Sequence, residues 1–247
     1  MEILLISAIA FVLSFIFALG GIGSALVLVP VLHWLGVPFA EARPTSLFVN
    51  TLSLIGASVS NLRSGRLDLR LGSPIIIGSI AMAPIAAYAS TFIDESALKL
   101  CFIAFLFMSS SMMLKPKRKT DREIYREKAP ALTLFLIGAL AGGSSGLLGV
   151  GGGGVVAPLM VLLGFNPKRI AMITALVVPF SSFTGFLAYW AMGNIHIPLV
   201  LCVGVAAALG GYLGTNYMQK HLAPGTVKKF LGAVIMLIGV KLLWQLF

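Results

Sequence analysis

Long apolar runs separated by short polar breaks dominate this chain of 247 residues. Hydrophobic residues make up 58% of the sequence and charged residues only 11%, whereas a soluble domain usually carries about 25% charged residues. So few charges do not solvate the surface of a globular protein, and lipid must cover most of it. Backbone groups in lipid must hydrogen-bond within the protein, and the runs are continuous rather than alternating. The sequence therefore predicts an all-α polytopic membrane protein.

The apolar segments form two sets of five. The first set covers roughly 3–19, 24–36, 45–62, 71–91 and 96–114, and the second roughly 130–148, 154–164, 173–192, 197–218 and 226–246. We divide the chain into a first transmembrane repeat, 1–114, a basic linker, 115–128, and a second transmembrane repeat, 129–247. The second segment of each set is shorter than the roughly 20 residues that cross a bilayer. It either re-enters the membrane or crosses a thin region, which gives about 8–10 transmembrane or re-entrant helical segments.

The two halves look duplicated. The run VLVPVL at 27–32 precedes VVAPLM at 155–160 by 128 positions, and Gly36 precedes Gly164 by the same offset. Matches at a nearly constant offset indicate an internal repeat.

Basic residues gather in four of the loops. They are Arg63, Arg66, Arg70, Lys115, Lys117, Arg118, Lys119, Arg122, Arg126, Lys128, Lys168, Arg169, Lys220, Lys228 and Lys229. The positive-inside rule assigns these loops to the cytoplasm and both termini to the outside. Corresponding loops of the two halves then lie on opposite sides, so we predict inverted repeats, an architecture typical of transporters.

Glycine clusters interrupt the chain before each short segment, at 20–24 and 149–154. The second cluster matches the dinucleotide-binding pattern G-x-G-x-x-G, but its flanks are membrane-length apolar runs rather than a soluble βαβ unit, so we reject that function. A break followed by a short helix leaves N–H groups unpaired at the positive end of a helix dipole, which favours an anion. Close helix packing is the alternative role of such glycines.

No Asp or Glu lies inside a long apolar segment, which argues against a cation pump and a carboxylate proton relay. The candidate anion-binding residues are Gly21, Gly23, Ser24, Thr45, Ser46, Asn50, Gly151, Gly152, Gly153, Gly154, Thr174, Ser181 and Ser182. Helix capping is the alternative role of Thr45, Ser46 and Thr174. Arg43 and Lys99 are expected mainly to extend toward lipid headgroups, with attraction of an anion as their alternative role.

Several classes of function are excluded by the same patterns. The apolar segments hold no nucleophile–base pair and no metal cluster, so we expect no enzyme, no cofactor and no metal. The net charge of +10 sits between apolar runs and is a topology signal rather than a nucleic-acid surface. The expected partners are a small anion and the lipid bilayer, with a homo-oligomer possible.

The glycine breaks and the segments that follow them resemble the sulfite exporter TauE/SafE family. The residues that carry the likeness run from Gly20 to Pro30 and from Gly149 to Pro158, with support from Thr45-Ser46-Leu47 and from Tyr189 to Gly193. The resemblance implies export of sulfite, sulfoacetate or a related organosulfonate across the plasma membrane by a multi-pass protein. We predict an alternating-access carrier with the anion at the broken-helix N-termini. An anion channel and a membrane scaffold without transport are the alternatives.

Overall fold

The described elements of this chain are all helical. The computed structural model describes residues 2–18, 23–63, 69–114, 126, 128–193, 197–221 and 224–246. Its helices are α1 (Glu2–Ala18), α2 (Ala25–Trp34), α3 (Phe39–Arg63), α4 (Leu69–Ala89), α5 (Glu95–Leu114), α6 (Ala131–Leu148), α7 (Gly153–Leu162), α8 (Pro167–Ala191), α9 (Ile197–His221) and α10 (Pro224–Leu246), with a 3₁₀ turn at Ser90–Phe92. The prediction of an all-α fold is confirmed.

Five of these helices are long and apolar enough to cross a membrane, within the described ranges. They are Leu69–Phe92, Glu95–Leu114, Ala131–Leu148, Arg169–Ala191 and Val200–Tyr217. Helix α3 has 25 residues, enough to span at about 1.5 Å per residue, but it is more polar. Helices α3 and α8 also begin earlier than predicted, at Phe39 and Pro167, because charged residues in their first turns hide those turns from an apolarity pattern.

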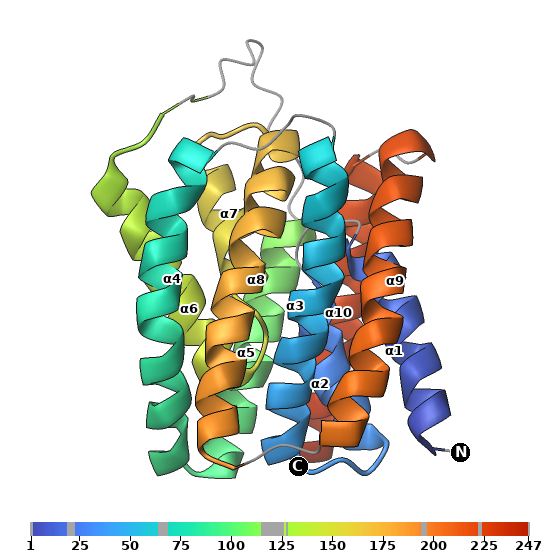
Figure 1. Cartoon of the computed structure of the whole chain (residues 1–247). Helices are drawn as coiled ribbons and strands as arrows, with labels where there is room; N and C mark the ends of the chain where they lie inside the picture. Colours follow the sequence, from blue (N-terminus) through green and yellow to red (C-terminus); the bar gives the residue numbers. More distant parts are fainter. Residues whose placement is uncertain are drawn as a thin grey trace.

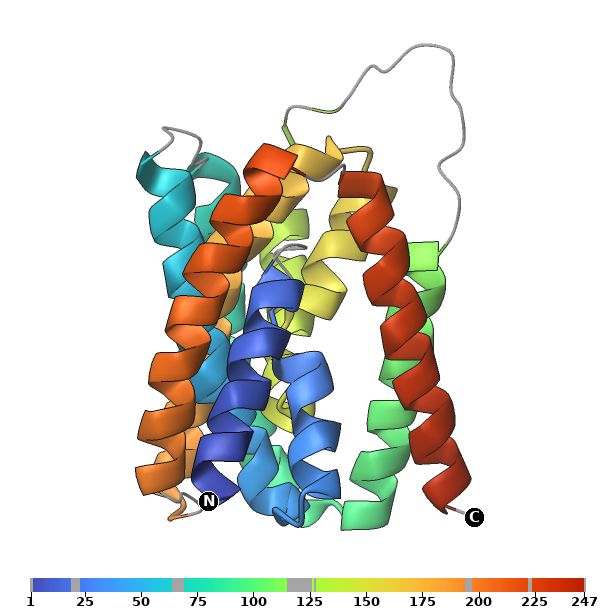
Figure 2. The same cartoon turned by 90° about the vertical axis from the view of Figure 1, so that its right-hand side faces the viewer.

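Each short helix, α2 or α7, runs back toward the end of the bundle at which the preceding helix begins. Helix α1 rises from the end that holds the N-terminus and stops inside the bundle, and α2 returns to that end (Figures 1 and 2). Helix α6 likewise runs inward from the opposite end of the bundle, and α7 returns to that end. With ten residues each, α2 and α7 cover only about 15 Å. Both pairs are therefore helical hairpins whose turns meet inside the protein, and their re-entry into the membrane stays a prediction.

The packing partners of the two halves correspond. Helix α1 lies along α9, while α6 lies along α4; α3 packs on α9, while α8 packs on α4. Helices α3 and α8 also pack on each other at the centre, and α5 packs on α10. The pair α5–α10 reaches the other helices mainly through the short ones, α10 on α2 and α5 on α7.

The helix ends that flank the basic loops fall at one end of the bundle. The top of Figure 1, which we call the linker end, holds the ends of α3, α5 and α9. The starts of α4, α8 and α10 lie there as well. Arg70 and Arg169 lie in the first turns of α4 and α8, and Lys229 lies in the second turn of α10. Both termini lie at the opposite end, which we call the terminal end. The basic residues at these helix starts therefore share one end, whereas Arg43, Lys99 and Lys241 lie toward the other, and a cytoplasmic location of the linker end stays a prediction.

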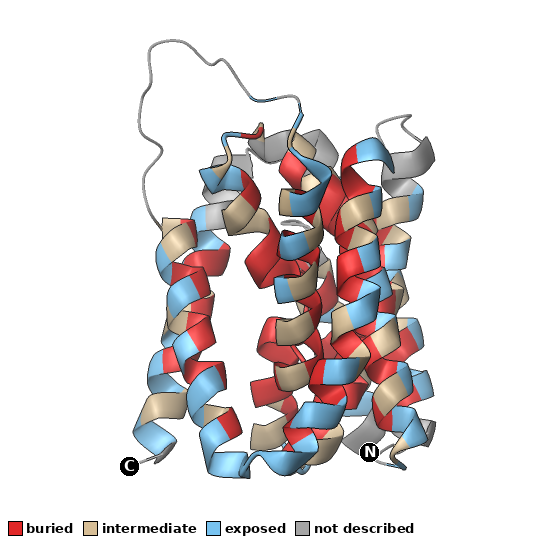
Figure 3. Cartoon of the chain, turned by 90° about the vertical axis from the view of Figure 1, so that its left-hand side faces the viewer, coloured by how far each residue is buried: buried red, intermediate tan, exposed pale blue. Residues whose placement is uncertain are grey.

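Large apolar side chains cover the outside of the bundle as well as its core. Buried residues line the inward faces of the helices and exposed ones the outward faces (Figure 3). The exposed ones include Leu132, Leu136 and Leu140, which lie on one outward face of α6 and are 69%, 53% and 61% accessible. Such a surface suits a hydrocarbon environment and not water.

Three glycines on α6, each four residues from the next, lie against the backbone of α4. A Cβ at Gly138, Gly142 or Gly146 would overlap a carbonyl oxygen of α4. Small residues at this spacing let membrane helices approach closely. Since Gly142 and Gly146 fall opposite Ser79 and Ala83 in turn, α4 and α6 run parallel.

Replacement of Gly142 by Ala should destabilise the protein, because the new methyl group meets the Ser79 Cα at 2.8 Å and the carbonyl beside it. We expect a loss of about 1–3 kcal/mol from overpacking. The neighbouring Gly143→Ala is the matched control, since its Cβ has no neighbour within 4 Å and alanine favours a helix by up to about 1 kcal/mol. The midpoints of thermal unfolding in detergent test this, and equal midpoints would contradict the packing.

Candidate functional site

The second glycine cluster ends α6 and starts α7 inside the bundle. Gly149, Gly151 and Gly152 all adopt positive φ angles, of 74°, 70° and 52°, a region that side-chain-bearing residues rarely enter. The chain thereby reverses direction within four residues and α7 begins at Gly153. Of the first cluster, Gly23 has a φ of 84°, and the candidate Gly21 lies outside the described residues.

Asn50 of α3 joins the two breaks. Its Oδ1 accepts a hydrogen bond from the Ala25 N–H at the start of α2 (3.4 Å), and its Nδ2 donates to the Ser182 Oγ of α8 (2.9 Å). A Cβ at Gly23 would overlap the Asn50 Oδ1, and a Cβ at Gly151 would overlap its Nδ2. The two glycine breaks therefore approach a single side chain from opposite sides.

Further hydroxyl groups surround this point, which we call the Asn50 centre. Ser24 shares a hydrogen bond of 3.0 Å with Ser14 of α1, and the side chains of Ser14, Ser24, Asn50, Ser181 and Ser182 are fully buried. The Cβ position of Gly152 lies 3.1 Å from the Ser181 Oγ. The structure thus brings together Gly23, Ser24, Asn50, Gly151, Gly152, Ser181 and Ser182.

The other candidates lie apart from this cluster or on its rim. Thr45 Oγ1 and Thr174 Oγ1 donate to the carbonyls four residues earlier in their own helices, both at 2.8 Å. Gly154 faces α5, where its carbonyl accepts a bond of 3.4 Å from Ser109 Oγ. Gly153 is the first residue of α7, and Ser46 is buried without a hydrogen-bond partner. These candidates lie outside the group of seven residues at the Asn50 centre, and their role in anion binding stays a prediction.

Arg43 contradicts the expectation that it extends toward headgroups, because its side chain is only 7% accessible. Its Nη1 donates to the Leu147 carbonyl at the end of α6 (3.2 Å) and to the Tyr189 hydroxyl (2.9 Å). The Tyr189 hydroxyl in turn donates to the Gly146 carbonyl at 2.7 Å. A helix end leaves carbonyls unpaired and carries a partial negative charge. Arg43 and Tyr189 therefore cap α6 where it stops inside the protein.

The sequence reading missed this cap. Arg43 looked peripheral because it stands before the predicted third segment, and the close approach of Leu147 to it depends on the fold. No local signal in the sequence pointed to this contact, since Glu41 stands only two residues before Arg43. The other candidate cation, Lys99, forms an ion pair with Glu95 (2.7 Å) and is partly exposed.

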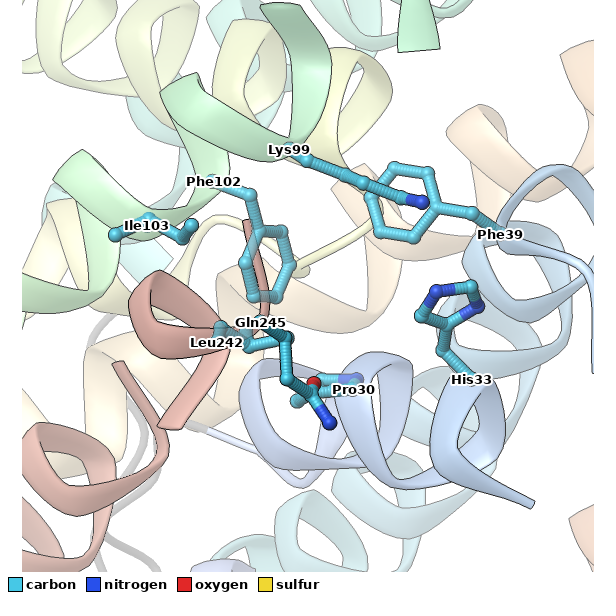
Figure 4. A pocket seen from close by; sticks show the side chains of 8 residues that line it. All are labelled: Pro30, His33, Phe39, Lys99, Phe102, Ile103, Leu242 and Gln245. Carbon is cyan, nitrogen blue, oxygen red and sulfur yellow. The ribbon is translucent and has the colours of Figure 1, made fainter. Parts of the chain in front are cut away.

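A cavity opens at the terminal end between α2, α3, α5 and α10 (Figure 4). It measures about 90 Å³, room for several water molecules. Its lining residues are Pro30, His33, Phe39, Lys99, Phe102, Ile103, Leu242 and Gln245. The Lys99 Nζ lies over the Phe39 ring, 5.8 Å from its centroid, and the His33 ring meets the same phenyl group edge-on at 6.0 Å.

The chemistry available at the Asn50 centre is hydrogen bonding without a fixed negative charge. The starts of α2 and α7 supply backbone N–H groups and the positive ends of two helix dipoles. Amide and hydroxyl side chains supply further donors. Among the described residues, no three His, Cys, Asp or Glu side chains come together to hold a metal ion. The arrangement suits a small anion.

Comparison with known proteins places this geometry in a family. The family model described as Sulfite exporter TauE/SafE matches residues 6–242. The chain is 27% identical to Probable membrane transporter protein YunE of Bacillus subtilis, over 91% of each chain. It is also 27% identical to Probable membrane transporter protein MJ0441 of Methanocaldococcus jannaschii, over 97% of this chain and 94% of the relative.

Replacement of Gly151 by Ala should destabilise the protein more than replacement of Gly164 by Ala. Both glycines have positive φ, 70° and 83°, so each variant carries the same conformational cost of about 1–2 kcal/mol. Only at Gly151 does the new methyl group also collide with Asn50, since Gly164 has open space around it. The difference between the two unfolding midpoints therefore measures the cost of the collision with Asn50 alone. A lower midpoint for Gly164→Ala than for Gly151→Ala would contradict the prediction.

Removal of the Tyr189 hydroxyl by Tyr189→Phe should cost about 1–3 kcal/mol, because a buried carbonyl of α6 and the Arg43 guanidinium each lose a partner. Tyr88→Phe is the control, because Tyr88 is 60% accessible on the outer face of α4 and should change stability by less than about 0.5 kcal/mol. Unfolding in detergent compares the two variants. Equal stability would show that the cap contributes nothing.

Proposed function

The chain belongs to the sulfite exporter TauE/SafE family of membrane transporters, and we propose that it exports a sulfur-containing oxyanion, such as sulfite or an organosulfonate, by alternating access. It is a multi-pass membrane protein with five candidate spanning helices in its described part. The observation that carries the proposal is the meeting of two broken helices at Asn50.

The bound anion would replace the Asn50 carboxamide at the helix starts. Asn50 Oδ1 already accepts from the Ala25 N–H, so an oxygen acceptor stands where an oxyanion would bind. Rotation of this side chain would free the N–H group of α2 and, on the other side, the hydroxyl of Ser182. Broken-helix N-termini hold anionic substrate groups in other transporters.

The two hairpins support access from opposite sides. The α1–α2 hairpin opens toward the terminal end and the α6–α7 hairpin toward the linker end. We propose that residues 1–114 and 129–247 are inverted repeats, with the basic linker 115–128 in the cytoplasm. Correspondence of the packing partners of the two halves supports this division. Small movements of either hairpin against α5–α10 would then expose the same centre to one side at a time.

The membrane potential is the proposed driving force. An inside-negative potential favours exit of an anion by about 2.3 kcal/mol per charge per 100 mV. Export of this kind requires no titrating carboxylate in the path, which agrees with the absence of Asp and Glu from the long apolar segments.

Proteoliposomes test the proposed function directly. We expect saturable uptake of radiolabelled sulfite that rises when a potassium gradient makes the interior positive, with competition by sulfoacetate, thiosulfate or sulfate. Uptake that never saturates and is accompanied by single-channel currents would indicate a channel. Vesicles that hold folded protein but take up none of these anions would contradict the transport of sulfur oxyanions.

Asn50→Asp should slow that uptake at least tenfold while the protein still folds. The new carboxylate accepts the same hydrogen bond from α2, but it repels an anion at about 4 Å by roughly 4 kcal/mol in a partly polar site. Asn166→Asp is the matched control, since it makes the same chemical change just before α8, near the linker end. We expect a loss of at least tenfold in initial rate for Asn50→Asp alone. Similar rates for both variants would remove Asn50 from the anion path.

A further inference from the structure

Buried polar atoms without a partner concentrate on one helix. In the described part of the chain four such side-chain atoms occur, Arg43 Nε, Ser46 Oγ, Ser53 Oγ and Thr215 Oγ1. Three of the four belong to α3. A buried donor that makes no hydrogen bond costs about 1–3 kcal/mol, so three on one helix call for a ligand or a structural reason.

These atoms follow a single face of α3. Phe39, Arg43, Ser46, Asn50 and Ser53 are spaced by four, three, four and three residues, the interval at which side chains lie one above another on a helix. The stripe begins at the cavity, where Phe39 is a lining residue, and passes Arg43 and Ser46 before it reaches the Asn50 centre.

The glycine loop runs alongside the same face. A Cβ at Gly149 would lie 2.7 Å from the Arg43 Cβ, and a Cβ at Gly151 would overlap Asn50. The loop therefore extends along α3 from Arg43 to Asn50. Because these glycines carry no side chains, they cover the path between the two residues with backbone alone.

Arg43 brings an uncompensated positive charge to this path. A guanidinium stays protonated in proteins, and a buried charge is costly unless it is paired. Its contacts are neutral: the Leu147 carbonyl, the Tyr189 hydroxyl and the rings of Phe39 and Tyr189, with centroids 5.3 and 5.2 Å from its Cζ. The α6 dipole compensates only part of the charge.

The cavity supplies a way in from the terminal end. Lys99 and Arg43 both lie within 6 Å of the Phe39 ring centroid, so the cation at the cavity and the buried cation contact the same ring. Figure 4 shows the Lys99 amine and the His33 ring directed to the phenyl group. An anion that displaces the Glu95 carboxylate from Lys99 would need only to pass Phe39 to meet Arg43.

We propose that Arg43 and Ser46 form a second subsite for a small oxyanion, one to two turns of α3 from Asn50 toward the terminal end. The Arg43 Nε–H and the Ser46 hydroxyl are its donors, and the guanidinium supplies its charge. The subsite passes the anion between the cavity and the Asn50 centre. This inference rests on the proposed function and adds to it a defined second binding position for the anion.

Ser46→Ala is the sharp test, because the Ser46 hydroxyl has no partner in the protein and its loss removes no contact that holds the fold. A hydrogen bond to a charged group contributes enough that we expect the KM for sulfite uptake to rise about tenfold. Thr215→Val is the matched control, because it also deletes a buried, unpartnered hydroxyl but does so on α9. We expect its KM to equal that of the wild type.

Two Arg43 variants distinguish a role of its positive charge in anion binding from its role in capping α6. Arg43→Lys and Arg43→Gln both lose the geometry that caps α6, and only the lysine keeps a positive charge. We expect a KM at least tenfold higher for the glutamine variant than for the lysine variant. Equal KM values for these two variants would assign Arg43 to the cap alone and overturn the subsite.

Failure of the subsite can be told from failure of the proposed function. If wild-type protein takes up sulfite and Ser46→Ala behaves as Thr215→Val does, the subsite is wrong and the transporter stands. If wild-type protein neither takes up sulfite nor gains thermal stability from it, the proposed function is wrong and the subsite is wrong with it.

Discussion

The requirement that backbone polar groups find partners inside the membrane determines the architecture of this protein. A helix that stops halfway leaves unpaired groups where no water is at hand, and each costs several kcal/mol if nothing replaces its partner. The chain does this twice and resolves the ends differently. Asn50 accepts at the start of α2, while Arg43 and Tyr189 donate at the end of α6. The same groups that repair the breaks make the centre suitable for an anion.

The two halves are alike in packing and unlike in chemistry. At the offset of 129 residues that relates Thr45 to Thr174, Arg43 corresponds to Met172 and Tyr189 corresponds to Ser60. The residues that cap α6 therefore have no charged counterpart at the corresponding positions of the sequence. In the proposed topology the cap lies on the terminal side of Asn50, so an anion would meet a cation on one side of the centre and neutral groups on the other. In the proposed mechanism such asymmetry would change how long the anion stays on each side of the centre, while the direction of net transport would still follow gradient and potential.

Most of the fold could be predicted from the sequence. For the Asn50 centre the sequence indicated the residues but not their contacts with one another. Continuous apolar runs predicted the helices, and segments too short to cross predicted α2 and α7, because length and apolarity are local properties. Gly151 and Asn50 were identified separately, and their contact with each other needed the tertiary structure. Thr45 and Thr174 stay candidates whose hydroxyls bond their own helix, and such a hydroxyl looks the same in sequence as one that faces a ligand. Arg43 was misjudged because α6 ends beside it only in the folded chain.

Asn50 also explains why a carboxylate would serve this centre badly. In the proposed mechanism, a side chain that occupies a helix start satisfies the N–H groups when the centre is empty and leaves when an anion arrives. A carboxylate would bind the helix dipoles more strongly and would repel the incoming charge. A neutral amide offers an oxygen of similar shape and can be displaced without that repulsion. The absence of acids from the long apolar segments and the presence of Asn50 where the two breaks meet thus follow from one electrostatic requirement.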